Sequence, residues 1–202
     1  MQYLYLIFAY LLGSIPTGVW YSRLKHNTDV RHLGSGNSGA TNVGRNFGLK
    51  AAVLVTVIDV VKGIVAIALA KQLFPNQDLL IMGAGIAAVI GHAYPIFAGF
   101  KGGKIVATSF GVMAGFQLVY GIAFALLLFI FIYLSSTISL SAMAAYFIGA
   151  LYIFFVEPPL YGYGFLLISL FMCYRHRQNL VRLFKGTESR IGWGLRNPKK
   201  KQ

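Results

Sequence analysis

The feature that most constrains how this chain folds is a run of 52 residues, 105–156, without one charged side chain. A helix needs about 20 apolar residues to cross a hydrocarbon layer of about 30 Å, so this run is long enough for two or three crossings. The composition agrees with that, since 57% of the residues are apolar and 11% are charged, whereas soluble domains carry about 25% charged residues. The chain is therefore predicted to be an all-α integral membrane protein.

The charge balance excludes other classes of protein. There are 18 Lys and Arg residues against 5 Asp and Glu, for a net charge of +13. A soluble nucleic-acid-binding protein would carry more charge and fewer aliphatic side chains, so no nucleic-acid partner is expected. A disordered chain is excluded by the same numbers. Cys173 is the single cysteine and no Cys/His cluster is present, so neither an internal disulfide nor a metal site is predicted.

Four further apolar segments flank the long run, at residues 1–22, 51–74, 79–100 and 158–174. Polar breaks at 115–117 and 135–137 divide the long run into three. The sum is seven transmembrane helices. The fourth, residues 104–116, is only about 20 Å long, so it is predicted to be a short or broken helix. No positive charge precedes the first segment, so it is expected to be a retained span and not a cleaved signal peptide.

Lysine and arginine set the expected topology. Residues 23–50, residues 101–104 and the tail from 175 onward together hold 16 of the 18 cations. Positively charged loops stay in the cytoplasm. Three crossings within the long run put all three clusters on that side, with the N-terminus outside and the C-terminus cytoplasmic. The three clusters are thus expected to gather on the cytoplasmic face.

The first cluster, residues 31–45, is dense in glycines, hydroxyls and amides. Glycines let backbone N–H groups turn toward an anion, and Arg45 can grip a phosphate with two hydrogen bonds. The alternative is a flexible solvated loop or a set of helix caps. The candidate substrate-binding residues here are Ser35, Gly36, Asn37, Ser38, Thr41 and Asn42.

The second cluster is Lys101, Gly102, Gly103 and Lys104, followed by a predicted helix that contains Thr108. A helix N-terminus presents free N–H groups and a partial positive charge to an anion. Lys104 is similar in role to a P-loop lysine, but the P-loop spacing is absent, so ATP hydrolysis is not predicted. The alternative is a pair of ordinary cytoplasmic lysines beside a turn.

The third cluster, residues 175–188, contains His176, Asn179, Arg182 and Glu188. Helical spacing puts His176 and Asn179 on one face, and Asn179 and Arg182 likewise. Glu188 could pair with an arginine of the first loop or hold the turn. The alternative is an anchor for anionic lipid headgroups, a role we assign outright to the lysines at 199–201.

Five polar residues lie inside or at the ends of the predicted spans. Asp59 and Lys62 are three apart in the second span; charges within a membrane indicate function, but a mutually neutralised pair fits equally well. His92 is expected to be a packed histidine at a helix contact. Ser139 and Ser141 could reach the cytoplasmic face, or they could cap a helix or bond to a neighbouring one.

Many cations with few carboxylates, set beside apolar helices, point to an amphiphilic substrate with a phosphate head. A transporter or flippase for phosphorylated solutes is a competing class. It would require polar residues at the membrane midplane and repeat symmetry, and we see no internal repeat. A lipid-anchored scaffold without chemistry would leave the amide-rich loop unexplained.

The ordered set of motifs resembles the acyl-phosphate:glycerol-3-phosphate acyltransferase family, PlsY. The resemblance runs through almost the whole chain, and no departure occurs within the three motifs. It rests on Gly13-Ser14-Ile15-Pro16-Thr17-Gly18, the stretch from Gly34 to Arg45, Lys101-Gly102-Gly103-Lys104 with Ala107-Thr108, and Arg175-His176 with Asn179, Arg182-Leu183 and Gly186-Thr187-Glu188.

The resemblance implies a bacterial inner-membrane enzyme with its active site facing the cytoplasm, within one domain that spans residues 1–202. It would transfer a fatty acyl group from acyl phosphate to the 1-hydroxyl of glycerol 3-phosphate, giving lysophosphatidic acid and phosphate, the first acylation of phospholipid synthesis. No cofactor is expected, and the partners are the two substrates and membrane lipids, with the protein a monomer. The His-x4-Asp motif of other glycerolipid acyltransferases is absent.

Acyl phosphate is already activated, so the enzyme has to position two phosphorylated molecules and offset their charge. We expect the first loop and the Gly102–Gly103 backbone to cradle the acyl-phosphate head. Glycerol 3-phosphate is expected to be held by Arg45, Lys104, Ser141, His176 and Asn179. No Gly-x-Ser-x-Gly elbow is present, which favours direct attack by the substrate hydroxyl. Either His176 or a substrate phosphate takes its proton.

Overall fold

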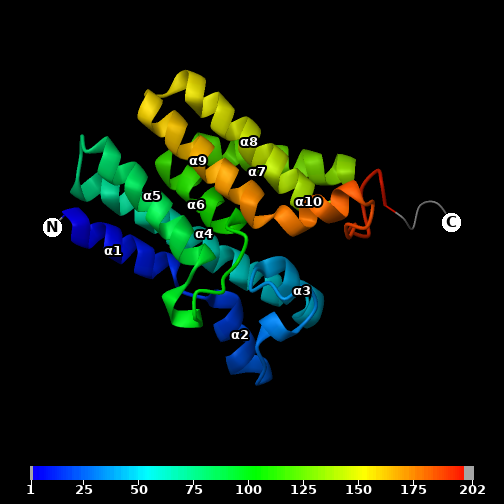
Figure 1. Ribbon diagram of the computed structural model, residues 1–202. Helices are drawn as coiled ribbons and strands as arrows, with labels where there is room; N and C mark the ends of the chain where they lie inside the picture. Colours follow the sequence, from blue (N-terminus) through cyan, green and yellow to red (C-terminus); the bar gives the residue numbers. More distant parts are fainter. Residues whose placement is uncertain (1, 198–202) are drawn as a thin grey trace. The chain divides into compact units, whose positions relative to one another are not determined.

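The computed structural model describes residues 2–197, all of whose regular structure is helical. The lysines at 199–201 lie outside the described residues. The chain divides into two compact units, Met1–Phe116 and Gln117–Gln202. The helices are coloured along the chain in Figure 1.

Unit 1 contains six α-helices and two short 3-10 helices. Its elements in chain order are α1 (Gln2–Gly13), α2 (Thr17–His26), η1 (Val30–His32), α3 (Ala40–Phe47), α4 (Leu49–Leu73), α5 (Asp78–Ala93), η2 (Ile96–Ala98) and α6 (Val106–Phe116). The first predicted span is bent by 40° between α1 and α2. The bend falls at Pro16, which has no N–H to donate and disfavours a helical conformation at the residue before it.

Close helix contacts in unit 1 depend on glycines. A Cβ atom on Gly111 of α6 would stand 2.0 Å from the Val60 carbonyl oxygen of α4. A Cβ on Gly63 of α4 would stand 2.3 Å from the Thr108 carbonyl oxygen of α6. Helices approach this closely where small residues face one another, as is common in membrane proteins. The start of α6 is thereby held directly against the middle of α4.

Unit 2 contains α7 (Leu118–Ser135), α8 (Ile138–Val156), α9 (Pro159–Arg175) and α10 (Arg177–Phe184). α8 packs against both α7 and α9. α7 buries only Gly121 and Phe124, so most of its apolar side chains are exposed. The segment after α10 returns to the turn between α7 and α8, where the Ile191 N–H donates to the Ser136 carbonyl oxygen at 2.8 Å.

The membrane class is confirmed in part. By length and hydropathy, four helical segments among the described residues could cross a membrane, or five if the bent α1–α2 pair is one span. Both predicted breaks in the long run are confirmed, because α6 ends at Phe116, α7 at Ser135, and α8 begins at Ile138. α6 has 11 residues, or about 17 Å of helix. The number of crossings and their direction remain a prediction.

Two boundaries differ from the sequence prediction. The third span was expected to run over residues 79–100, but α5 ends at Ala93 because Pro95 follows, and η2 replaces its last turn. No helix was predicted within the first loop, but residues 40–47 form α3. α3 begins after Gly39 and ends at Phe47, and it is followed by Gly48, whose φ of 87° disfavours a residue with a side chain.

Candidate active site

The first loop folds around the side chain of Asn42, which is 1% exposed. Its Nδ2 donates to the carbonyl oxygens of Val30, Leu33 and Asn37 at 2.9–3.0 Å. Its Oδ1 accepts from the Ser35 N–H at 3.0 Å. These bonds use the polar atoms of Asn42 within the protein, so this residue braces the loop instead of facing a substrate.

Three of the predicted polar side chains of the first loop remain on its surface. Ser35, Thr41 and Arg45 are exposed, while Ser38 is buried and Asn37 uses its Oδ1 to accept from the Gly39 N–H. Arg45 forms no ion pair with any described residue. This loop therefore offers a guanidinium and two hydroxyl groups from a braced backbone.

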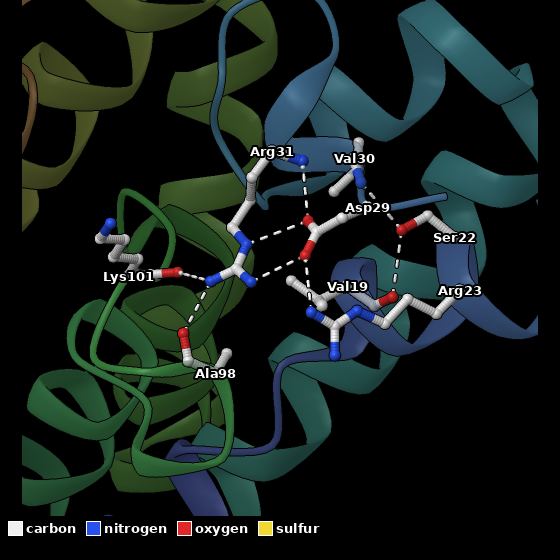
Figure 2. A network of polar contacts seen from close by, with 8 residues as sticks. All are labelled: Val19, Ser22, Arg23, Asp29, Val30, Arg31, Ala98 and Lys101. Carbon is white, nitrogen blue, oxygen red and sulfur yellow. Dashed lines mark hydrogen bonds and ion pairs between the residues drawn. The ribbon is translucent and has the colours of Figure 1, made fainter. Parts of the chain in front are cut away.

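Asp29 organises the entrance to this loop, as Figure 2 shows. Its carboxylate pairs with Arg31 at 2.7 Å and Arg23 at 2.9 Å, and it accepts from the Arg31 N–H at the start of η1. The hydrogen bonds from Arg31 hold the pKa of Asp29 below its usual range, against the effect of burial. The same pairing raises the pKa of Arg31. Arg31 and Asp29 were not among the predicted site residues.

The turn over residues 99–105 connects η2 to α6 and carries the Lys101–Lys104 cluster. Phe100 and Ile105 have φ angles of 59° and 61°. The left-handed conformation costs an L-residue with a side chain about 1–2 kcal/mol. Both ends of the turn are therefore held in an unfavourable backbone conformation by their surroundings, a condition often found at functional sites.

The two glycines of this turn lie against the end of α5. The Gly102 N–H donates to the Ala93 carbonyl oxygen at 3.2 Å, and the Gly103 N–H donates to that of His92 at 3.1 Å. A Cβ atom on Gly103 would stand 2.2 Å from Nε2 of His92. The amides expected to cradle a phosphate are thus engaged with the protein backbone, and the absence of side chains lets the turn pack closely on His92.

A buried polar network lies behind the turn. Asp59 and Lys62 of α4 form an ion pair at 2.7 Å, and each is 3% exposed. Asp59 also accepts from the Thr17 hydroxyl at 3.0 Å, and Nδ1 of His92 lies 3.1 Å from Oγ1 of Thr108. Thr108 was predicted to contact the substrate. It is fully buried and contacts His92 instead. Because Nδ1 of His92 also lies 3.7 Å from Oδ1 of Asp59, the network joins α2, α4, α5 and α6, which sequence spacing could not indicate beyond the Asp59–Lys62 pair.

Glu188 holds the third cluster together within unit 2. Its carboxylate accepts from Oγ of Ser139 at 2.7 Å, Nδ2 of Asn179 at 2.6 Å and Nε of Arg182 at 2.7 Å. Burial alone would raise the pKa of Glu188, but these three donors outweigh it and lower the pKa. The sequence left open whether Glu188 pairs with an arginine of the first loop or holds the turn, and in the structure its ion-pair partner is Arg182 of its own cluster.

His176 lies at the junction of α9 and α10, so it does not share one continuous helix with Asn179 as expected. Its ring is buried, and Nδ1 lies 2.9 Å from the Met172 carbonyl oxygen. A carbonyl oxygen can only accept, so Nδ1 carries a proton and Nε2 of the neutral ring is an acceptor. Ser141 is buried and donates to the Thr137 carbonyl oxygen at 2.8 Å, with its Oγ 3.0 Å from that of Ser135.

A groove of about 380 Å³ lies beside the third cluster in unit 2. Leu140, Leu180 and Leu183 supply apolar walls, and Glu188, Arg190 and Arg196 supply charged ones. Among residues 2–197 no group of three His, Cys, Asp or Glu side chains is arranged to hold a metal ion. The predicted residues of the first two clusters thus lie in unit 1, and those of the third, with Ser141, lie in unit 2.

Comparison with known proteins decides the family. A family model described as glycerol-3-phosphate acyltransferase matches residues 3–186. The chain belongs to the glycerol-3-phosphate acyltransferase family. It is 42% identical to the glycerol-3-phosphate acyltransferase of Bacillus subtilis strain 168, over 94% of this chain and 97% of that protein. It is 41% identical to that of Enterococcus faecalis strain ATCC 700802, over 98% and 95%.

Solved structures agree with this membership. The chain is similar to PlsY, an integral membrane glycerol 3-phosphate acyltransferase, in its glycerol 3-phosphate form, with a TM-score of 0.91 and 38% identity over 95% of this chain and 96% of that one. The lysophosphatidic acid form gives a TM-score of 0.86 over 95% of each chain. The resemblance seen in the motifs is confirmed, and this member of the glycerol-3-phosphate acyltransferase family is an integral membrane acyltransferase.

Proposed function

We propose that this acyltransferase takes its acyl group from acyl phosphate and transfers it to the 1-hydroxyl of glycerol 3-phosphate. The hydroxyl oxygen forms the new ester bond to the acyl carbon, and the bond from that carbon to the phosphate oxygen breaks. The products are lysophosphatidic acid and phosphate. The observation that carries this proposal is the braced first loop, whose Asn42 holds the backbone while Ser35, Thr41 and Arg45 stay exposed.

The residues divide into two tasks in this proposal. The acyl-phosphate head binds the first loop through Ser35, Gly36, Asn37, Ser38 and Thr41, beside the turn that Lys101, Gly102 and Gly103 shape. Glycerol 3-phosphate is assigned to Arg45, Lys104, Ser141, His176 and Asn179. Asn42, Thr108, Arg182 and Glu188 hold these groups in place. Fixed donors around two phosphates lower the barrier by positioning and by offsetting charge.

In this proposal His176 binds the attacking hydroxyl of glycerol 3-phosphate. With Nδ1–H donated to Met172, Nε2 of the neutral ring can accept a hydrogen bond from that hydroxyl. The hydroxyl proton then passes to Nε2 or to a phosphate oxygen of the acyl phosphate. Both routes give direct transfer without an acyl-enzyme.

The proposed cellular setting follows from the cation distribution. Seven crossings place the N-terminus outside and the clusters on the cytoplasmic face of a bacterial inner membrane, where phosphorylated metabolites are found. One domain of residues 1–202 acts as a monomer without a cofactor.

The deciding experiment measures phosphate release from palmitoyl phosphate by the purified protein in detergent, where no second compartment exists. Release should depend on glycerol 3-phosphate and, at a glycerol 3-phosphate concentration near the wild-type KM, collapse in Lys104→Ala. Lys50→Ala removes an exposed cation outside the proposed site, so it should retain full activity. A folded wild-type protein that releases no phosphate would contradict the acyl-phosphate donor. Measuring transport of phosphorylated solutes into vesicles would then test the competing class.

A further inference from the structure

The turn over residues 99–105 is buried at its C-terminal end, at Gly103 and Ile105, and exposed at its N-terminal end. Gly99, Phe100 and Lys101 are exposed, and Gly99 and Phe100 are consecutive residues with positive φ. A backbone with two such residues in succession is unfavourable in an isolated chain. Something outside the turn must therefore hold it in this conformation.

Arg31 bonds to the turn on both sides of these two residues. Its Nη1 donates to the Ala98 carbonyl oxygen at 2.7 Å and to the Lys101 carbonyl oxygen at 3.2 Å (Figure 2). One guanidinium nitrogen from η1 thus ties together the two carbonyl groups that flank the left-handed pair. These contacts join segments 67 and 70 residues apart in the sequence.

Asp29 fixes the direction of the Arg31 side chain. Nε of Arg31 donates to Oδ1 at 3.0 Å and Nη2 donates to Oδ2 at 2.7 Å. The Asp29 side chain is 7% exposed and that of Arg31 is 18% exposed. A buried carboxylate that holds one edge of the guanidinium leaves the other edge facing the turn, and a planar guanidinium is suited to both contacts at once.

A count of donors separates Arg31 from a substrate-binding arginine. A guanidinium has five N–H groups, and the contacts of Arg31 use four of them. The remaining one cannot form a two-pronged grip on phosphate. Arg45, in contrast, is exposed and forms no ion pair with the described residues.

We propose that Arg31 is a positioning residue, which holds the turn over residues 99–105 in the conformation that presents Lys104 to the phosphate of glycerol 3-phosphate. This inference rests on the proposed role of Lys104. Arg31 touches no substrate. Its effect on the reaction passes through the backbone of the turn.

The test compares Arg31→Lys and Arg31→Ala with Arg23→Ala. Lysine keeps the charge but has no planar fork, so it cannot hold Asp29 and two carbonyl groups together. We expect the KM for glycerol 3-phosphate to rise about tenfold in both Arg31 variants, or ~1.4 kcal/mol of binding, while kcat changes less than about twofold. Arg23 also pairs with Asp29, but its side chain is 56% exposed and it makes no contact with the turn. Arg23→Ala should keep the wild-type KM.

A double substitution tests whether the effect passes through Lys104. If Arg31 acts by presenting Lys104, then adding Arg31→Lys to Lys104→Ala should raise the KM no further. Multiplied effects in the double variant would overturn the proposal. A lower kcat with unchanged KM and a lower unfolding temperature would also overturn it, because that pattern describes a smaller folded fraction.

The same variants separate this inference from the proposed function. If Lys104→Ala raises the KM for glycerol 3-phosphate and Arg31→Lys does not, the positioning role is wrong and the role of Lys104 stands. If Lys104→Ala leaves the KM unchanged, the role of Lys104 is wrong and the positioning role fails with it. If Arg31→Ala does not fold, Arg31→Lys alone is compared with the wild type, since the lysine retains one ionic contact to Asp29.

Discussion

At the scale of single residues, His176 has the orientation that general-base chemistry requires, because Met172 fixes the proton on Nδ1. His176→Gln removes the titrating group and keeps a side chain that can hydrogen-bond. If Nε2 takes the hydroxyl proton, kcat should fall about 10²–10⁴-fold and the limb of the pH–rate profile that belongs to histidine should disappear. A stopped assay from pH 5 to 9 measures both.

The opposite result has a definite meaning. Residual activity with an unchanged pH profile would exclude His176 as the essential base and assign the proton to the substrate phosphate. Ser189→Ala, an exposed position after Glu188 with no assigned task, serves as the control and should match the wild-type profile.

Candidate site residues can be predicted from the sequence where several of them fall within one short motif. The sequence singles out three clusters, and within them Arg45 and Lys104 by their charge, and the roles of these residues stay a prediction. The bracing tasks of Asn42 and Arg31 were not predictable, because a hydrogen bond from a side chain to a distant carbonyl group leaves no periodic pattern. The one local signal for Arg31 is Asp29 two residues earlier, at the N-cap of η1.

At the scale of helices, the Asp59–Lys62 pair joins α4 to its neighbours inside an apolar interior. Lys62 also donates to the Ile15 carbonyl oxygen at 3.0 Å, where the chain bends between α1 and α2. Lys62→Met leaves the Asp59 carboxylate buried without its ammonium partner. Removing one member of a buried pair costs about 3–5 kcal/mol, so we expect a clear fall in unfolding temperature in detergent.

The matched double variant tests that explanation. Asp59→Asn combined with Lys62→Met removes both charges, so it should recover most of the lost stability. If the double variant is as unstable as Lys62→Met alone, the loss comes from the Ile15 contact or from packing and not from an unpaired charge.

Helices were largely predictable from the sequence, since each predicted span contains at least one helix. Hydropathy and polar breaks decide where helices start and end within the long run. α3 was missed because it has 8 residues and few apolar positions within a glycine-rich segment. The early end of α5 follows from Pro95, whose effect a count of apolar residues does not include.

At the scale of the whole molecule, the expected topology can be mapped with one cysteine at a time. Cys173 is the only native cysteine, so Cys173→Ser gives a clean background. Asn76→Cys and Pro158→Cys lie between predicted spans on the outer side, and Lys185→Cys lies on the inner side. A membrane-impermeant maleimide should label the first two in intact cells and the third only after permeabilisation.

The number of crossings decides this pattern. If the long uncharged run crossed twice and not three times, Pro158→Cys would be protected and Lys185→Cys labelled from outside. Charge distribution favours three crossings, because only that number gathers the basic segments on one side. The sequence was sufficient to predict the helical membrane class, whereas the crossing count depends on α6, which is shorter than a bilayer.

The bare surface of α7 bears on how the protein is made. Of its 18 residues only two are buried, and six of its eleven leucine, isoleucine and phenylalanine side chains are exposed. Each of those side chains gains about 1.5–3 kcal/mol on leaving water. A fully synthesised chain in the cytosol would aggregate with other copies through this exposed apolar helix. We therefore expect synthesis to be coupled to insertion, with ribosomes delivering α7 directly into the lipid.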